Sequence, residues 1–472
     1  MSRSSGLVKN FAVFALGSIG SKMLQFLLLP FYTRVLSDEQ YGTVDILQSI
    51  GTLLLPIVSL TIFDAVFRFA MDGNTKKEEA FTIGMITVAI GTMLLLLCGI
   101  VLPEFIGYKK YIWLIVFYVS VQMFRSVTSQ YIRAIGKVKL FTIDNMLQTL
   151  AILLFNILLM VVLHLGIEGY LLGYIIGNFI SFLFVFISQK LWKDLKFKHI
   201  EKKTYSAMYK FSIPLIPNAI CWWLTTMIGR IMVTAYLGAD KNGLFAVAFK
   251  VPTIVTIVVG VFMQAWQISA NNECTNYDFD EYNSKIFHVL QSVTFLMSAF
   301  LILCSKLIVS ILDSSFYDAW HYIPVMMVGI CFFTFAQFLG ALYTASKKTI
   351  MAFVTNFTTA VINIVGNIIL LPKIEVMGAA VSLALSYLFF WLFRAFDTRK
   401  LVKIHYDLKA MVLNLCLIIL IMLVVIFEFE YWIFYGICIF FVMILVNFKT
   451  LLMLVREAVK IVKVCFNLKR SM

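Results

Sequence analysis

The sequence predicts an all-α polytopic membrane protein with about fourteen transmembrane helices, and its composition, its apolar spans and its short connections each support this prediction. The chain has 472 residues, of which 61% are hydrophobic and 14% are charged, and its mean hydropathy is +0.92. A soluble domain is about 45–50% apolar and about 25% charged. The chain therefore has too little polar surface to cover a fold in water, and a bilayer is the solvent that fits it.

The apolar spans are long enough to cross a hydrocarbon core of about 30 Å, which takes roughly 20 helical residues. Short connections favour packed helical hairpins over inserted domains. Because the bilayer core offers no water to the backbone, each span has to be a helix. The spans lie near residues 11–36, 43–70, 80–102, 111–134, 140–163, 170–190, 211–237, 243–270, 286–312, 320–346, 350–371, 377–396, 409–427 and 431–448.

The positive charge gathers on one side of the membrane when the N-terminus is placed in the cytoplasm. Most of the 39 Lys and Arg residues then lie at cytoplasmic ends, and the outer side holds Arg34, Lys109, Lys110, Lys241 and Lys373. This is the positive-inside pattern, and it explains the net charge of +14 without any nucleic-acid partner. An even number of spans puts both termini in the cytoplasm.

The chain divides into two halves at its longest cytoplasmic loop, Lys190–Lys210, which contains seven lysines. We expect an N-terminal lobe over 1–190, a linker over 191–210, a C-terminal lobe over 211–396, and two additional spans with a basic tail over 397–472. A weak internal repeat supports this division, because LSDEQYG at Leu36–Gly42 recurs as LGADKNG at Leu237–Gly243. Transporters are often built from such repeats, with the substrate path between them.

Polar stripes with a cation occur in three of the predicted spans. Span one carries Lys22 and Gln25, span seven carries Arg230, and span eight carries Lys250 and Gln264. A charge at the bilayer centre costs roughly 2.5–3.5 kcal/mol, so such residues tend to face a watery cavity. Together they could line one cationic cavity for a phosphate or diphosphate. The alternatives are ion pairs with carboxylates, or side chains that reach to the interface.

The charged side chains in spans two, four and five allow two roles each. Asp64 and Arg68 are four residues apart and are expected to form an ion pair, with ion coupling or gating as the alternative. Arg125 either meets the substrate or pairs with an acid such as Asp144, which is a second candidate for coupling or gating. We expect no cofactor and no metal, because the sequence has no GxxxxGK[ST] loop and its five histidines lack ligand spacing.

Three segments give the chain a family resemblance. The stretch Phe31–Ile46 reads FYTRVLSDEQYGTVDI and resembles the hallmark after the first helix of bacterial polysaccharide transporters. The turn Arg133–Lys137 and the Ile167–Gly169 start of span six resemble the corresponding positions. The chain is thus similar to the O-antigen, capsule and exopolysaccharide flippases of the multidrug/oligosaccharidyl-lipid/polysaccharide exporter superfamily.

The resemblance implies a fold, a substrate and partners. It implies two six-helix lobes in a V shape around a cationic cavity, in the bacterial cytoplasmic membrane. Its substrate would be an undecaprenyl-diphosphate-linked oligosaccharide, moved between leaflets by alternating access, and its partners would be membrane lipids, a polysaccharide polymerase and a chain-length regulator. The cavity cations that it implies are Lys22, Arg68, Arg230 and Lys250.

Three other functions stay open at this point. A lipid II flippase for peptidoglycan synthesis belongs to the same superfamily and shares its helical plan. A cation-coupled multidrug exporter usually has twelve spans and needs acids that bind cations, so the extra helix pair and Lys22 argue against it. A membrane polymerase or ligase needs a large outer loop with catalytic groups, which the short loops do not provide, so we expect no enzyme.

Overall fold

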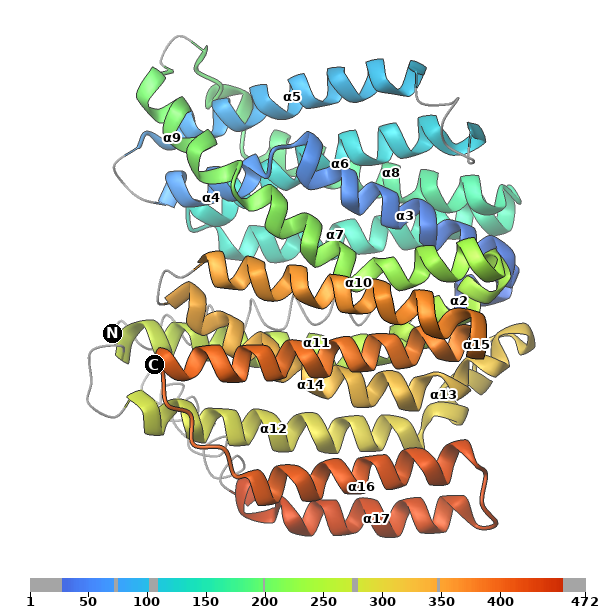
Figure 1. The fold of residues 1–472 in the computed structure, drawn as a ribbon. Coiled ribbons are helices and arrows are strands. Elements are labelled where there is room, and N and C mark those ends of the chain that lie inside the picture. The colour runs from blue at the N-terminus through green and yellow to red at the C-terminus, as the bar shows by residue number, and fades with distance from the viewer. Residues whose placement is uncertain are drawn as a thin grey trace, which may run out of the picture. The chain divides into compact units, whose positions relative to one another are not determined.

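A computed structural model describes residues 28–71, 75–101, 109–197, 200–273, 279–345 and 349–452 of the chain. Its regular secondary structure in these ranges is helical throughout (Figure 1). Lys22 and Gln25, and most of the predicted first span, lie outside the described residues. The chain forms two compact units, Met1–Ala246 and Val247–Met472, and each is described by itself. The division into lobes 1–190 and 211–396 stays a prediction.

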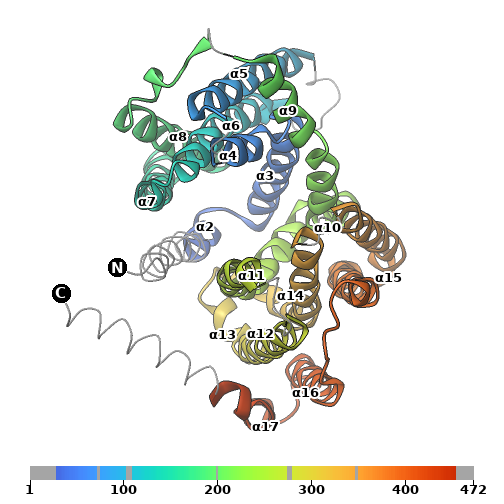
Figure 2. The same cartoon turned by 90° about the vertical axis from the view of Figure 1, so that its left-hand side faces the viewer.

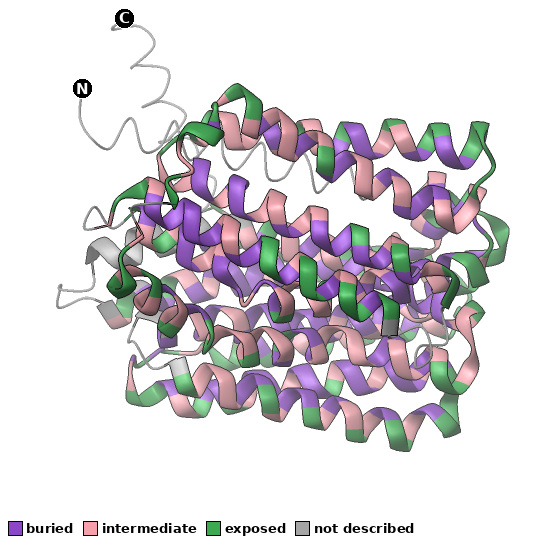
Figure 3. Cartoon of the chain, turned by 90° about the horizontal axis from the view of Figure 1, so that it is seen from above, coloured by how far each residue is buried: buried purple, intermediate pink, exposed green. Residues whose placement is uncertain are grey.

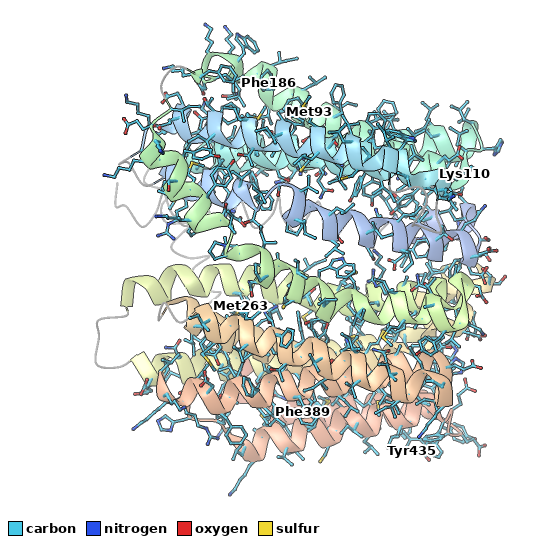
Figure 4. All side chains as sticks on the ribbon, turned by 45° about the horizontal axis from the view of Figure 1, so that its top comes forward. Met93, Lys110, Phe186, Met263, Phe389 and Tyr435 are labelled. Carbon is cyan, nitrogen blue, oxygen red and sulfur yellow. The ribbon has the colours of Figure 1, made fainter. Side chains whose placement is uncertain are left out.

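The first unit is a bundle in which α6 packs against α3, α4, α5 and α8, and α7 packs along α8 (Figure 2). A salt bridge of 2.7 Å between Lys110 and Glu168 joins the start of α6 to the start of α8, and Figure 4 labels Lys110 at that end of the helices. The helices are α2 (Leu29–Val35), α3 (Asp38–Val58), α4 (Ile62–Met71), α5 (Lys77–Val101), α6 (Ile112–Ala134), α7 (Val138–Asn156), α8 (Gly166–Ser188), α9 (Lys202–Ser212), α10 (Leu215–Leu237) and the start of α11 (Ala239–Glu273).

The second unit is built on the pairing of α14 with α15, and α12 packs on α14. The long α15 is two helices joined by a kink, because Ile374 and Glu375 have non-helical backbone angles. The helices are α12 (Phe279–Leu303), α13 (Ser305–Ser310), α14 (Ile323–Ala345), α15 (Thr349–Asp397), α16 (Leu408–Ile426) and α17 (Trp432–Val446).

The additional helix pair α16–α17 belongs to the second unit through its contacts with α12 and α14. The two helices are joined by a buried pair of side-chain amides: Asn447 donates to Asn414 over 2.7 Å, and Asn414 donates back over 3.3 Å. At the other end of the pair, Lys306 of α13 binds Glu428 and lies between the rings of Trp320 and Trp432. These contacts fix the pair in register.

The helices have the lengths and surfaces of membrane spans. In the described ranges, eleven helices are long and apolar enough to cross a bilayer, and Trp432–Val446 is a shorter apolar helix. Buried and exposed residues alternate along each helix (Figure 3), and many of the exposed ones are large and apolar, such as Met93 and Phe434. The fold is an all-helical polytopic membrane fold, as the sequence predicts.

One predicted span is interrupted near its middle, and a second is interrupted near its start. Span two is not one helix over 43–70: α3 ends at Val58 and α4 begins at Ile62. Between them Leu60 and Thr61 have φ angles of 52° and 48°. A positive φ is an outlier for a β-branched residue such as Thr61. Span seven, predicted over 211–237, differs: Ile213 and Pro214 separate α9 from α10 near its start, and both keep helical backbone angles.

Candidate functional site

A buried ion pair joins α3 to α10 inside the first unit. The guanidinium Nη1 of Arg230 donates to Oδ1 of Asp45 over 2.7 Å, and the two side chains are 7% and 6% exposed. Tyr41, one turn before Asp45, is buried and interacts electrostatically with both groups. Two full charges at this burial require each other, because either one alone would be an uncompensated charge in an apolar interior.

The local sequence of α3 places Asp45 at this position. The helix begins with a capping box, in which Ser37 accepts from the backbone N–H of Gln40 and Gln40 accepts from the N–H of Ser37. Two turns further on, Asp45 faces α10, and Ser49 and Thr52 continue the same face at helical spacing.

The contact between the two helices continues along this face. The indole N–H of Trp223 donates to the carbonyl of Ser49 over 2.7 Å and to Oγ1 of Thr52 over 3.2 Å. The hydroxyl of Ser49 lies 3.4 Å from the sulfur of Met227. We call this contact, from Asp45–Arg230 to Thr52–Trp223, the α3–α10 seam.

The seam ends in a backbone contact between the two repeated sequence segments. A Cβ on Gly42 would meet the carbonyl oxygen of Ala239, and a Cβ on Gly243 would meet the carbonyl oxygen of Asp38. The side-chain amide of Asn242 donates to the carbonyl of Gly42 over 3.0 Å. The glycines at equal offsets in the two segments are therefore the positions where the backbones approach most closely.

The two interrupted spans meet at their interruptions. The hydroxyl of Thr61 donates to the backbone carbonyl of Ser212 over 2.7 Å, and both residues are buried. On one side of this bond α3 packs on α10, and on the other side α4 packs on α9. The two spans thus form two packed pairs of half-helices joined at one level. Positive φ angles outside glycine are often kept at sites that move.

Arg125 and Asp144 lie together within a second polar network. Nη2 of Arg125 lies 3.4 Å from Asp144 and 2.8 Å from Oδ1 of Asn145, and its Nε donates to Ser181 over 2.7 Å. Ser181 donates in turn to Asp144, whose side chain has no exposed surface. The network joins α6, α7 and α8, and the ion pair that the sequence allowed as one reading of Arg125 is present.

The expected ion pair between Asp64 and Arg68 was wrong. In the described part of the chain the guanidinium of Arg68 lies 4.5 Å from the ring centre of Phe211 and is exposed, with no ion pair to Asp64. Asp64 interacts electrostatically with Arg133 of α6 instead. Tertiary packing determines these partners, because α4 lies against both α6 and α9. Arg68 of α4 therefore contacts Phe211 of α9, and Asp64 of α4 interacts with Arg133 of α6.

The other predicted residues are placed only in part. Lys250 lies in α11, in the second unit, and is partly buried. Gln264 lies on the same helix, but its side chain is outside the described residues, as are Lys22 and Gln25. The common cationic cavity of spans one, seven and eight therefore stays a prediction. Among the described residues, no three His, Cys, Asp or Glu side chains come together to hold a metal.

Sequence reasoning missed three buried charges, Asp45, Glu79 and Arg394. Asp45 is an acid in an apolar span and could have been found by the rule that was applied to Arg230. Arg394 stands near the predicted cytoplasmic end of its span, where a cation is ordinary. It is nevertheless 4% exposed and donates to the carbonyl of Ala336 and to the side chains of Thr355 and Asn356, over 2.7, 3.1 and 3.2 Å.

Comparisons with known proteins agree with this architecture. A family model described as "Polysaccharide biosynthesis protein" matches residues 7–267. The "Lsg locus putative protein 1" of Haemophilus influenzae is 24% identical over 54% of this chain and 64% of its own length. A second protein of that organism, an "Uncharacterized membrane protein", is 24% identical over 54% of this chain and 62% of its own length. The matches thus span less than two thirds of these relatives.

Solved transporters share the fold. The structure of "Lipid II flippase MurJ, inward closed conformation" has a TM-score of 0.71 at 14% identity, over 95% of this chain and all of that one. An inward-facing "multidrug resistance MATE family transporter of the MOP superfamily" has a TM-score of 0.64 at 10% identity, over 82% of this chain and 98% of that one. At such identities the likeness concerns the fold alone.

Proposed function

Because the chain belongs to the polysaccharide biosynthesis protein family, a membrane transporter family of the MOP superfamily, we propose that it is a flippase for lipid-linked sugars. Its substrate would be an undecaprenyl-diphosphate-linked oligosaccharide repeat unit, destined for O-antigen, capsule or exopolysaccharide. The protein would lie in the bacterial cytoplasmic membrane with both termini in the cytoplasm, and a polymerase and a chain-length regulator would act beside it.

The observation that carries the proposal is the α3–α10 seam together with the interruptions beside it. The seam is tightly packed at the predicted outer end, where Gly42 approaches Ala239 and Arg230 holds Asp45. The same two spans are interrupted at Leu60–Thr61 and Ile213–Pro214. Half-helices that are joined by one hydrogen bond between breaks can tilt about that level while each pair stays packed. Closure at one end and a hinge away from that end are what alternating access requires.

The cations supply the chemistry for a diphosphate. The guanidinium of Arg68 is exposed beside Phe211, where an entering headgroup could meet it. Arg230 is held by Asp45 in this arrangement, so it would reach the substrate only when the seam opens and it exchanges a carboxylate for a phosphate. Lys22 and Lys250 would complete the path. Asp64 and Asp144 are the candidates for coupling to an ion.

The experiment follows the leaflet in which the lipid-linked sugar resides. In a strain that lacks the gene, repeat units should accumulate on the lipid carrier and stay protected from a membrane-impermeant glycosidase added to spheroplasts. The wild-type gene should restore cleavage, whereas Arg230→Met should not. The control Lys110→Gln alters an exposed ion pair that is no part of the seam and should restore cleavage fully.

Two results would contradict the proposal. Normal surface polysaccharide in the deletion strain would show that another protein moves the repeat unit. Lysis with lipid II trapped on the inner face would assign the chain to peptidoglycan synthesis instead. A change in drug sensitivity alone, with full cleavage of the repeat unit, would favour export of small molecules.

A further inference from the structure

The segment between α8 and α10 is anchored to α5 and α6 by hydrogen bonds. The phenol of Tyr131 donates to the carboxylate of Asp194 over 2.9 Å, and the backbone N–H of Lys196 donates to the hydroxyl of Thr82 over 3.0 Å. The N–H of Glu201 donates to Glu79 over 2.8 Å, and the hydroxyl groups of Tyr209 and Thr87 are hydrogen-bonded over 2.5 Å. The backbone of the segment is therefore held in place along the ends of α5 and α6.

The side chains that this anchored segment presents to the outside are mostly lysines. Six of its lysines are described and all six are exposed: Lys190, Lys193, Lys196, Lys202, Lys203 and Lys210. None of the six has an ion pair among the described residues. Of the two acids in the segment, Asp194 is engaged by Tyr131. The described part of the segment thus carries six lysines against two acids, Asp194 and Glu201, on a fixed surface.

Large aromatic side chains stand exposed between the lysines. Trp192 is 46% exposed, Phe197 is 63% exposed, and Tyr205 is 48% exposed. On α9 the positions of Lys203 and Lys210 are seven apart and share a face, while Met208 is fully buried on the opposite side. We call these six lysines and three aromatic residues the basic aromatic surface.

We propose that the basic aromatic surface binds the headgroups of anionic phospholipids at the cytoplasmic boundary of the membrane. Lysine ammonium groups meet phosphates there, and aromatic rings prefer the level between headgroups and acyl chains. α9 begins at Lys202, and α10 follows it after Ile213 and Pro214. In the charge-based orientation its first turns would therefore lie at the cytoplasmic side of a membrane span. This proposal goes beyond transport and uses only the charge-based orientation.

The arrangement favours a lipid surface over an acidic protein as the partner. A protein interface depletes lysine in its centre, whereas lysine stems extend readily along a bilayer boundary. Trp192 and Tyr205 each have one aromatic neighbour in the chain, Phe186 and Tyr209. The exposed parts of the three rings would face water, and the bilayer provides an apolar partner for them without any second protein. An acidic protein partner is instead an outcome of the test.

The test uses the purified full-length chain and two lipids that differ in headgroup charge. Native mass spectrometry would measure the binding of phosphatidylglycerol and of phosphatidylcholine to the wild type, to the fourfold variant K190Q/K193Q/K202Q/K203Q, and to a control variant. The control K109Q/K110Q/K241Q/K373Q removes the same number of charges from the predicted outer side. Each lysine near an anionic surface contributes roughly five-fold, so the fourfold variant should lose at least about ten-fold in phosphatidylglycerol affinity.

A second measurement places an aromatic ring of the surface against lipid. In nanodiscs that contain only this protein and lipid, brominated phosphatidylglycerol should quench a fraction of the tryptophan fluorescence that the Trp192→Phe variant lacks. Unchanged affinity in the fourfold variant would overturn the proposal. So would an equal loss in the control, or equal affinity for both lipids. Absence of a Trp192-dependent quench would also overturn it, and would leave an acidic protein as the partner.

Discussion

Asp45→Asn should open the α3–α10 seam. The substitution keeps the shape of the side chain and an acceptor for Arg230, but it removes the negative charge. The guanidinium would then be a buried charge without its counter-ion, in a place where both side chains are less than a tenth exposed and solvent screens little. The free-energy cost of this buried charge destabilises the closed seam, and the cost disappears when the seam opens and Arg230 reaches water.

The structure sets the size of this effect. Removing one partner of a buried ion pair costs about 3–5 kcal/mol. The lower end applies here, because Oδ2 of Asp45 has no hydrogen-bond partner in the described part of the chain and the pair rests on one close contact. A cost of about 3 kcal/mol corresponds to a roughly hundred-fold larger open population.

A cysteine reporter measures that population. Ser49 is buried in the seam, so Ser49→Cys in a chain without its native cysteines should react slowly with a maleimide in detergent. Adding Asp45→Asn should raise the labelling rate roughly hundred-fold. The control Glu39→Gln removes an exposed acid from the first turn of the same helix and should leave the rate within about five-fold, since such a charge is worth only about 0.3–1 kcal/mol.

The same reporter gives the result that would refute the reasoning. The double variant Asp45→Leu with Arg230→Met replaces the pair by apolar groups and should label slowly, because such replacements are often neutral. An unchanged rate in Asp45→Asn, with the protein folded, would mean that the ion pair does not hold the seam. Fast labelling in the apolar double variant would mean that the seam opens because the packing of these side chains is disturbed, and not because a charge is left unpaired.

Three further predictions concern other contacts. Gly243→Ala should also speed labelling in the seam, because its methyl group meets a backbone carbonyl, whereas Gly260→Ala on the same helix meets nothing within 4 Å and should not; equal rates would refute this. Arg394→Ala should lower the melting temperature, because it removes three buried hydrogen bonds from a charged donor, at about 1–3 kcal/mol each before relaxation, and an unchanged melt would contradict it. Lys306 hydrogen-bonds Glu428 and lowers the pKa of that carboxyl, so the tie between α13 and the α16–α17 turn should be complete above the ordinary pKa of a glutamate, about 4.3, and lost as the pH falls below it. The protection of backbone amides in that turn, corrected for the intrinsic exchange rate at each pH, should fall in acid for the wild type, and Lys306→Ala should show the low protection at both pH values.

The fold was predictable because it follows from composition and periodicity alone. Long apolar spans in a bilayer have no alternative to helix, so the helical plan is confirmed. The interruption at Leu60–Thr61 was not predictable in the same way. Pro56 lies in the last turn of α3, but a proline signals a bend and does not reveal that the next helix begins at Ile62 or that Thr61 hydrogen-bonds Ser212.

The site was less predictable than the fold, because partners across helices are set by packing. The sequence allowed Arg125 to pair with Asp144, since both lie in adjacent spans. The sequence also suggested an ion pair between Asp64 and Arg68, because positions four apart share a helix face. In the structure Arg68 contacts Phe211 and Asp64 interacts with Arg133, and both of these partners lie on other helices. Spacing within a helix gives the face of a residue, but it does not give the neighbour on that face.

The weak sequence repeat has a geometric cause, because the two repeated segments contact each other in the structure. Residues 38 and 42 of the first segment stand at the same offsets as residues 239 and 243 of the second. Gly42 lies against the carbonyl of Ala239, and Gly243 lies against the carbonyl of Asp38, so each segment makes the contact that the other makes. Reciprocal contacts of this kind are the rule in an interface with two-fold symmetry, where one surface has to fit its own copy. A glycine at that offset is then required twice, once in each segment, and a substitution at Gly42 should open the seam as much as one at Gly243.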